Sequence, residues 1–540
     1  MAVDKQGWVV GKVLAAHAAT RGDQPFLQFQ DDPAVTYAEA DAAANRIANG
    51  LLRHDIAPGE TVAVMVANSV VYCTIWFALS RLGAVQVCVN TAYRGLFLRH
   101  VLENSQSRTI LIHADYLPAL AEIEHQVPAV RKALVLGLEQ AATIPAFQRI
   151  ALLPFEELQQ APADPIDRAV SYRDLGAIMY TSGTTGPSKG VLMPHAHLYL
   201  LGLGLVENMR VTAADIYYIC MPLFHANAML MQLYGTLIAG AKAVIVPSFS
   251  ASRWVDDIRR YGITITNTLG VMTEYIYRQP PRPEDALPTL RRICAVPAPA
   301  DIRENFDRRF NTRLIEGYGM TEINIVAYHP LDTPYRSGSF GVVYDKYFEV
   351  RVVDPDSDEE MPPGQVGEVV ARPKEPYCFM QGYNAMYEKT VEAWRNFWFH
   401  TGDAAWRDED GYLYFVDRIK DRIRVRGENL SSYEIEKVLG EHPAIAEVAA
   451  IAVKSEVQGR EDEVKACIVL KPGQQLTPTE VLDYCQPRMP YFAVPRFVEF
   501  LDALPKTPTE KVRKAVLRDG GITPATWDRQ AAGYEVRRVR

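Results

Sequence analysis

Paired cysteines, long apolar runs and a secretory leader are all missing from this sequence. The chain of 540 residues has seven scattered cysteines and no C-x-x-C pair, which is typical of buried thiols in a reducing compartment. The most apolar region, 61–89, is broken by polar residues such as Asn68 and Arg81, so no run within it reaches the roughly 18 apolar residues of a membrane span. The first twenty residues have no signal-peptide pattern, and we expect a cytoplasmic protein.

An excess of positive charge is also missing. The net charge is −8, from 57 Lys and Arg against 65 Asp and Glu, which disfavours non-specific attraction to nucleic acid or to an anionic membrane. Internal repeats and low-complexity segments are absent as well. A chain this long exceeds the roughly 250–300 residues at which single cores stop growing, so we expect more than one domain.

Helix-like and strand-like patterns alternate over the first four hundred residues. Thr36 is a cap candidate for a helix over 36–54, and 60–68 is a short β-prone run followed by a buried helix over 69–84. Segments 241–249 and 256–270 continue the alternation. This pattern predicts an α/β fold with layered, largely parallel sheets.

The pattern changes after about residue 335. Short strands separated by turn clusters predict a β-rich subdomain over about 335–418, and a charged run then opens a smaller α/β unit. We therefore expect an N-terminal domain over 1–418 and a small C-terminal domain over 419–540. The segment after Asp519 supports no prediction.

The link over 181–190, "TSGTTGPSKG", is rich in Gly, Ser and Thr and follows a strand-like run. Its backbone N–H groups and hydroxyls, with Lys189 as a positive charge, suit a phosphate. The spacing does not fit the G-x-x-x-x-G-K-[ST] phosphate loop. A solvent-exposed Thr/Gly turn would have the same composition.

Two further stretches have the chemistry of a nucleotide site. In "LIEGYGMTE" (314–322), glycines flank Tyr318, whose ring could stack on a base, and Thr321 and Glu322 suit a phosphate and its magnesium. The alternative is a strand-to-loop turn with an exposed glutamate. In 399–436, Asp403 follows Gly402 in an expected turn and could accept two ribose hydroxyls. The alternative there is a charged, solvated linker.

Taken together, these motifs resemble the adenylate-forming superfamily of acyl-CoA synthetases, peptide-synthetase adenylation domains and luciferases. The resemblance runs from about Val35 to Lys514 and includes T-S-G-T-T-G-x-x-K-G, Y-G-M-T-E, T-G-D, D-R-x-K-D…G-E-N and "LPKTPTEKVRK". It implies an ATP- and Mg²⁺-dependent ligase that makes an acyl-AMP, releases pyrophosphate and transfers the acyl group to CoA. It also implies that the small C-terminal domain is mobile.

The resemblance assigns roles to individual residues. A first set would hold the β- and γ-phosphates of ATP: Thr181, Ser182, Gly183, Thr184, Thr185, Gly186 and Lys189. A second set would surround the rest of the nucleotide: Gly317, Tyr318 and Gly319 at the adenine, Thr321 at the α-phosphate, Glu322 at Mg²⁺, and Asp403 and Arg418 at the ribose. Lys420 would be the hinge, and Gly427 would approach the pantetheine arm of CoA.

Four residues would take part in the reaction itself: Lys511, Thr184, Glu322 and His225. Lys511 matches the catalytic lysine of the family, but Glu510 stands where relatives usually have Gly. A carboxylate there could weaken the charge of Lys511 or point to solvent. Lys506 and Lys514 are nearby rivals, and Lys511 could also be a surface lysine of a charged tail.

The acyl side of the site is less specific. His225 either lines the acyl pocket or is a core histidine, and His195 and His197 have no third metal ligand, so we interpret them as core residues. The apolar run after His225 fits a pocket for a hydrophobic acid or core packing of a helix. Pro297 and Pro299 depart from the Gly-rich loop of many relatives.

Three functions remain open at this point. The favoured one is an acyl-CoA ligase close to the crotonobetaine/carnitine–CoA ligase and fatty-acid–CoA ligase branches, with a small carboxylic acid, ATP and CoA as partners. The others are an enzyme that loads a carrier-protein thiol, and a nucleotide- or acyl-binding protein without turnover. A homodimer is compatible with each.

Overall fold

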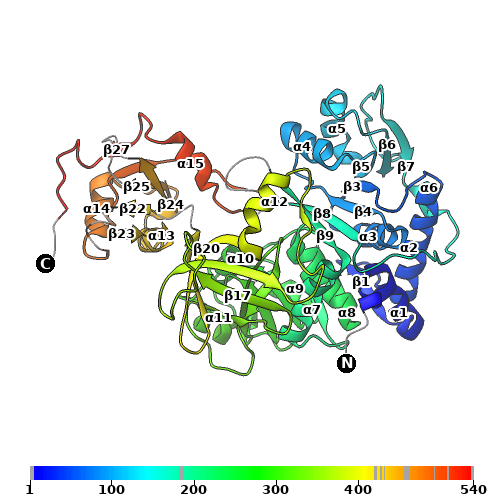
Figure 1. The fold of residues 1–540 in the computed structure, drawn as a ribbon, viewed down its shortest axis with the longest axis horizontal. Helices are drawn as coiled ribbons and strands as arrows, with labels where there is room; N and C mark the ends of the chain where they lie inside the picture. Colours follow the sequence, from blue (N-terminus) through cyan, green and yellow to red (C-terminus); the bar gives the residue numbers. More distant parts are fainter. Residues whose placement is uncertain are drawn as a thin grey trace.

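The computed structural model describes residues 5–181, 188–418, 423–425, 428–430, 432–454, 462–489, 491, 493–507 and 510–536. A large N-terminal domain of two sheets and their helices is joined to a smaller C-terminal α/β domain, which lies to one side of it (Figure 1). The predicted α/β class and the division into a large and a small domain are confirmed.

The first sheet of the large domain is mostly parallel. Six neighbouring strands of this sheet pair in parallel, in the order β8, β4, β3, β5, β6 and β7. Strands β9 and β19 add an antiparallel edge beside β8. Parallel strands are covered on both faces, and the apolar run of β3 is accordingly buried. In sheet order, the strands are β19 Gly382–Tyr383, β9 Lys189–Pro194, β8 Leu175–Thr181, β4 Val85–Cys88, β3 Thr61–Met65, β5 Thr109–His113, β6 Lys132–Leu136 and β7 Ala151–Pro154.

The second sheet combines a parallel half with an antiparallel half. Strands β1 and β10 to β14 form the parallel half, and β15 begins the antiparallel half. The predicted segment is β-rich, but its strands continue this sheet, except β19, which joins the first sheet. In sheet order, the strands are β17 Phe348–Val353, β18 Gly367–Pro373, β20 Phe399–Arg407, β21 Leu413–Arg418, β16 Ser339–Val343, β15 Asn324–Tyr328, β14 Leu314–Met320, β13 Arg292–Val296, β12 Ile265–Leu269, β10 Ile216–Ile219, β11 Lys242–Ile245, β1 Pro25–Phe29 and β2 Val35–Thr36.

The two helices predicted over 36–54 and 69–84 begin where the sequence indicates. Thr36 caps α2 through a reciprocal capping box with Glu39, and Ser69 caps α3, of whose thirteen residues eleven are buried. The helices of the large domain are α1 Val10–Arg21, α2 Tyr37–Leu52, α3 Val70–Leu82, α4 Gly95–Ser105, α5 Leu117–Ile123, α6 Glu156–Gln159, α7 His195–Met209, α8 Gly235–Ala239, α9 Trp254–Arg260, α10 Gly270–Tyr277, α11 Arg303–Phe310 and α12 Tyr387–Ala393, with a π-helix η4 at Asn227–Tyr234. Short 3₁₀ turns are η1 Lys5–Gly7, η2 Ala114–Tyr116, η3 Glu124–Gln126, η5 Pro283–Asp285 and η6 Arg395–Phe397.

The C-terminal domain has its own sheet and core. The segment after Asp519, for which the sequence supports no prediction, adds the edge strand β27 to β26. The elements are β22 Ile423–Val425, β23 Glu428–Leu430, α13 Ser432–Gly440, β24 Ile445–Lys454, β25 Asp462–Leu470, α14 Pro478–Cys485, β26 Phe497–Phe500, α15 Lys514–Gly520 and β27 Trp527–Asp528.

All seven cysteines are buried as free thiols, as their scatter predicts. Burial raises the pKa of their thiols, for example that of Cys88 to about 11. Within the part of the chain that the structure describes, no helix has the length and apolarity that a membrane crossing needs.

Candidate active site

The Gly- and Thr-rich link joins the ends of an antiparallel hairpin in the first sheet. Its flanking residues Thr181 and Lys189 face each other as the last pair of β8 and β9, and Thr181 Oγ1 donates to the carbonyl of Lys189 at 3.5 Å. The prediction that the link follows a strand is confirmed. Five predicted phosphate-binding residues lie outside the described residues: Ser182, Gly183, Thr184, Thr185 and Gly186.

The second motif forms the hairpin of β14 and β15. The register of the two strands shifts between Tyr318 and Gly319. A Cβ on Gly319 would lie 1.9 Å from the carbonyl oxygen of Asn324, so the close approach of β15 already requires glycine there. Gly317 lies on the same strand, and Thr321 lies half-buried in the turn that follows.

Tyr318 and Asp403, 85 residues apart in the chain, meet through a hydrogen bond. The Tyr318 hydroxyl donates to Asp403 Oδ2 at 2.7 Å, and the Tyr318 ring stacks on Phe340 with centroids 4.5 Å apart. Phe340 therefore covers one face of the ring, and stacking on a base remains a prediction for the other face.

Asp403 lies within strand β20, and the expectation of a turn is wrong. The chain passes Gly402 at a φ of 71° and stays in the strand, where the Gly402 N–H donates to Glu368. Asp403 is 4% exposed and is the register partner of Arg418 on β21. The solvated-linker alternative is therefore wrong for 399–418. Only the backbone of Arg418 is described, and Lys420 and Gly427 lie outside the described residues.

Glu322 is buried beside a tyrosine that sequence reasoning missed. Its side chain is 5% exposed, which contradicts the alternative of an exposed glutamate, and its Oε1 accepts a hydrogen bond from the Tyr383 hydroxyl at 3.1 Å. The ammonium of Lys189 lies 4.5 Å from the centroid of the Tyr383 ring. Tyr383 thus connects Lys189 of the first sheet to Glu322 at the β14–β15 turn. No local pattern around residue 383 points to this role.

Glu316 is a second residue that the sequence analysis did not single out. It lies in the buried part of β14, just before Gly317, and accepts a hydrogen bond from the backbone of Ala298. Its Oε2 has no hydrogen-bond partner among the described residues. Burial raises the pKa of the Glu316 carboxyl to about 8, so this group is largely protonated at neutral pH.

The histidines differ in their surroundings. His195 and His197 are fully buried on α7, where burial lowers their pKa values to about 4 and about 3, as for core histidines. His225 is half-buried, and its Nε2 has no hydrogen-bond partner in the described part of the chain. Burial, and secondarily the charge of Lys511, lower the pKa of His225 to about 4. The charge of Lys511 thus reaches from the C-terminal domain to the large domain.

The three candidate lysines are in different positions. Lys514 Nζ lies 2.6 Å from Ser432 Oγ and 2.7 Å from Glu436 Oε1, so it is held within the C-terminal domain. Lys506 is paired there with Glu447 and Glu510. Both rivals are therefore engaged within the C-terminal domain, whereas the charge of Lys511 contributes to the lowered pKa of His225 in the large domain.

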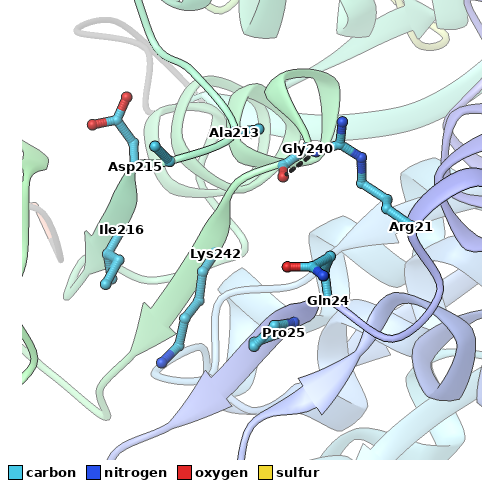
Figure 2. Close-up of a pocket in the computed structure, with 9 residues that line it drawn as sticks. Arg21, Gln24, Pro25, Ala213, Asp215, Ile216, Gly240 and Lys242 are labelled. Carbon is cyan, nitrogen blue, oxygen red and sulfur yellow. Dashed lines mark hydrogen bonds between the residues drawn. The ribbon is translucent and has the colours of Figure 1, made fainter.

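A cavity of about 400 Å³ lies elsewhere in the large domain (Figure 2). It is bordered by the end of α1 and the starts of β1, β10 and β11. Arg21 Nη1 donates to the carbonyl of Gly240 at 3.0 Å, and the Lys242 ammonium and the Asp215 carboxylate point away from Arg21. None of the nine residues that line this cavity belongs to the motifs above, so it is separate from the candidate site.

Comparison with known proteins gives two family matches and several relatives. Residues 14–384 match the AMP-binding enzyme family and residues 434–511 match the AMP-binding enzyme C-terminal domain. A crotonobetaine/carnitine–CoA ligase of Salmonella paratyphi B is 30% identical over 509 residues, which cover 93% of this chain and 97% of the relative.

Two solved structures have the same fold. An anthranilate CoA ligase in complex with anthranoyl-AMP is similar with a TM-score of 0.84 and 25% identity, covering 95% of this chain and 97% of that one. ATP-bound MatB from Rhodopseudomonas palustris is similar with a TM-score of 0.82 and 26% identity, covering 95% and 99%. The matched domains and the shared fold extend over nearly the whole chain, which therefore belongs to the AMP-binding enzyme family.

Proposed function

We propose that this protein is an ATP-dependent, AMP-forming acid–CoA ligase. The carboxylate oxygen of a small acid attacks the α-phosphorus of ATP, the bond to the β-phosphate oxygen breaks, and pyrophosphate leaves. The CoA thiol then attacks the acyl carbon, and AMP leaves. The observation that carries this proposal is the meeting of Tyr318 with Asp403, and of Lys189 with Glu322 at Tyr383.

The nucleotide would bind across these two contacts. Asp403, oriented by the Tyr318 hydroxyl, accepts hydrogen bonds from the ribose hydroxyls, with Arg418 beside it in the register. Thr321 contacts the α-phosphate, and the link from Thr181 to Lys189, including Thr184, binds the β- and γ-phosphates.

Glu322 fits a magnesium ligand by its chemistry. It offers a buried carboxylate at the phosphate end of the site, and Mg²⁺ is usually held by one or two carboxylates together with substrate phosphates. When bound, Mg²⁺ offsets phosphate charge. The Tyr383 hydroxyl bond to Oε1 keeps the carboxylate in place.

Lys511 would stabilise the adenylation transition state. Attack of one anion on another builds negative charge at the α-phosphorus, and a fixed ammonium there is worth on the order of 3–4 kcal/mol. The lysine lies on the C-terminal domain, which would turn about Lys420 after the first step, so that Gly427 approaches the pantetheine arm. We place the domain boundary between residues 418 and 419. His225, neutral at pH 7, would line the space between Lys511 and the acyl group.

The identity of the acid rests on less. In the apolar run after His225, Met229, Leu230 and Leu233 of the π-helix are fully buried. Both core packing and the wall of a pocket for a hydrophobic acid would bury them. The relatives named crotonobetaine/carnitine–CoA ligase suggest that betaine-like acids belong in the first test, beside fatty and aromatic acids.

A panel assay tests the proposal. The purified protein is incubated with ATP, Mg²⁺ and fatty, aromatic, alicyclic or betaine acids, and pyrophosphate and thioester are measured with and without CoA. Acid-dependent pyrophosphate with CoA thioester is the expected result. Pyrophosphate without thioester would point to a carrier-protein thiol as the acceptor. ATP binding without pyrophosphate from any acid would contradict the ligase and favour a binding protein.

A further inference from the structure

Hydrogen bonds join Thr507 to Glu510 and Lys511. The Thr507 N–H donates to the Lys511 carbonyl at 2.8 Å, the Glu510 N–H donates to the Thr507 carbonyl at 2.9 Å, and the Lys511 N–H donates to Thr507 Oγ1 at 3.1 Å. Lys506 and Val512, which flank these residues in the chain, form an antiparallel bridge. The backbone of Lys511 is therefore held from Thr507.

The residue before Lys511 has an unusual backbone conformation. Glu510 has a φ of 61°, in the left-handed region where glycine is favoured. This conformation gives a physical reason for the glycine that the resemblance places at this position. Glu510 has a side chain despite this backbone strain, and the contacts of its carboxylate show what that side chain does.

The ammonium of Lys506 forms ion pairs with two carboxylates, one of which belongs to Glu510. Lys506 Nζ lies 2.7 Å from Glu447 Oε2 on β24 and 3.2 Å from Glu510 Oε2. The hydrogen bonds to Glu447 and then to Glu510 raise the pKa of Lys506, so its ammonium stays charged at neutral pH. The carboxylate of Glu510 is thus directed toward Lys506 and β24.

An uncompensated carboxylate at Glu510 would work against adenylation. It would add negative charge one residue from the lysine that must meet the α-phosphate, where negative charge develops in the transition state. The ammonium of Lys506 offsets that charge, and its second partner Glu447 anchors it to the sheet of the C-terminal domain.

We propose that Lys506 is a positioning residue for adenylation, which holds the carboxylate of Glu510 against β24 and so preserves the charge of Lys511 at the reacting phosphate. This inference rests on the proposed function, since it assumes that Lys511 acts in the adenylation step. On this proposal, the negative charge of Glu510 does not weaken Lys511, because Lys506 neutralises it.

The test separates the two half-reactions in Lys506→Met, Glu510→Gln and the double variant. Pyrophosphate release with the acid found in the panel reports adenylation, and thioester formation from the supplied acyl-AMP and CoA reports the second step and the folding of each variant. Lys506→Met should slow adenylation about fivefold, the scale of one exposed ion pair, with thioester formation unchanged. The double variant should recover the wild-type adenylation rate, because the carboxylate charge is gone.

Lys454→Met is the matched control. Lys454 leaves the same strand β24 and pairs with Asp462 at 2.9 Å on an exposed surface, so this variant should change neither rate. Equal adenylation by Lys506→Met and wild type would overturn the inference. So would a defect that Glu510→Gln fails to relieve, since Lys506 would then act through its own charge. A wild-type protein without pyrophosphate release would remove the proposed function, and the inference with it.

Discussion

At the scale of single residues, the most specific prediction concerns the side chain of Lys511. In the proposed mechanism its ammonium stabilises the negative charge that develops at the α-phosphorus, so Lys511→Ala should lower adenylation at least about a hundredfold, the scale of losing one charge-stabilising group. Thioester formation from supplied acyl-AMP should be spared. Pyrophosphate release and thioester formation are measured separately, with Lys454→Ala as a surface control. Unchanged adenylation would transfer the role to Lys506 or Lys514.

Glu316 should give the protein a recognisable pH dependence. Its pKa is raised from 4.5 to about 8 in the folded state, so between these pH values the folded protein binds more protons than the unfolded chain. The free energy of unfolding should therefore fall as pH rises from about 4.5 to about 8 and then level off. Glu316→Gln should remove this part of the pH dependence.

Thermal unfolding temperatures at pH 5 and pH 8 measure this effect. The control is Glu304→Gln, at an exposed glutamate on the nearby α11. Identical pH dependence in Glu316→Gln and wild type would show that Glu316 ionises at its ordinary pKa and would refute the assignment.

A substitution at Gly319 in the β14–β15 hairpin tests whether this glycine is needed for packing or for ligand binding. A Cβ at position 319 would meet the carbonyl oxygen of Asn324 at 1.9 Å, and overpacking of this kind costs about 1–3 kcal/mol. Gly319→Ala should therefore lower the unfolding temperature even without nucleotide, whereas Gly7→Ala, with open space around it, should not. Full stability with lost ATP binding would instead assign Gly319 to the ligand.

The elements were predictable where local chemistry decides them. The cap at Thr36, the buried helix after residue 69 and the apolar run of β3 are visible in the sequence, and the structure has them as expected. Asp403 was wrongly predicted to lie in a turn because the glycine before it, Gly402, is typical of turns. Gly402 does have a positive φ, but it remains in the strand, where its N–H donates to Glu368. The sequence does not encode that partner locally.

Across the molecule, prediction failed where contacts join distant segments. Tyr383 and Glu316 acquire their roles from neighbours on other strands, and no spacing in the sequence reveals these. The edge strand β27 depends on its pairing with β26, so the last segment had no local signal. The resemblance supplied the site residues that periodicity could not, and their roles remain predictions.

Tyr383 allows a test of cooperation between the two sheets. Tyr383→Phe keeps the ring beside Lys189 but removes the hydroxyl bond to Glu322. Hydrogen bonds to charged groups are worth about 1.5–3 kcal/mol, so ATP in the presence of Mg²⁺ should bind at least about tenfold more weakly by calorimetry. Tyr387→Phe, at an 80% exposed residue on α12, is the control. Equal affinity of Tyr383→Phe and wild type would remove Tyr383 from the site.

If nucleotide binds at the proposed site, the position of Tyr383 makes nucleotide affinity depend on the spacing of the two sheets. Lys189 belongs to the first sheet and Glu322 to a turn of the second, and the side chains between the sheets share one apolar core. A substitution in that core that shifts one sheet against the other would change the gap that the triphosphate must span. ATP would then bind more weakly even though no residue that contacts ATP had been replaced. Tight ATP binding would accordingly indicate that the core between the sheets is correctly packed.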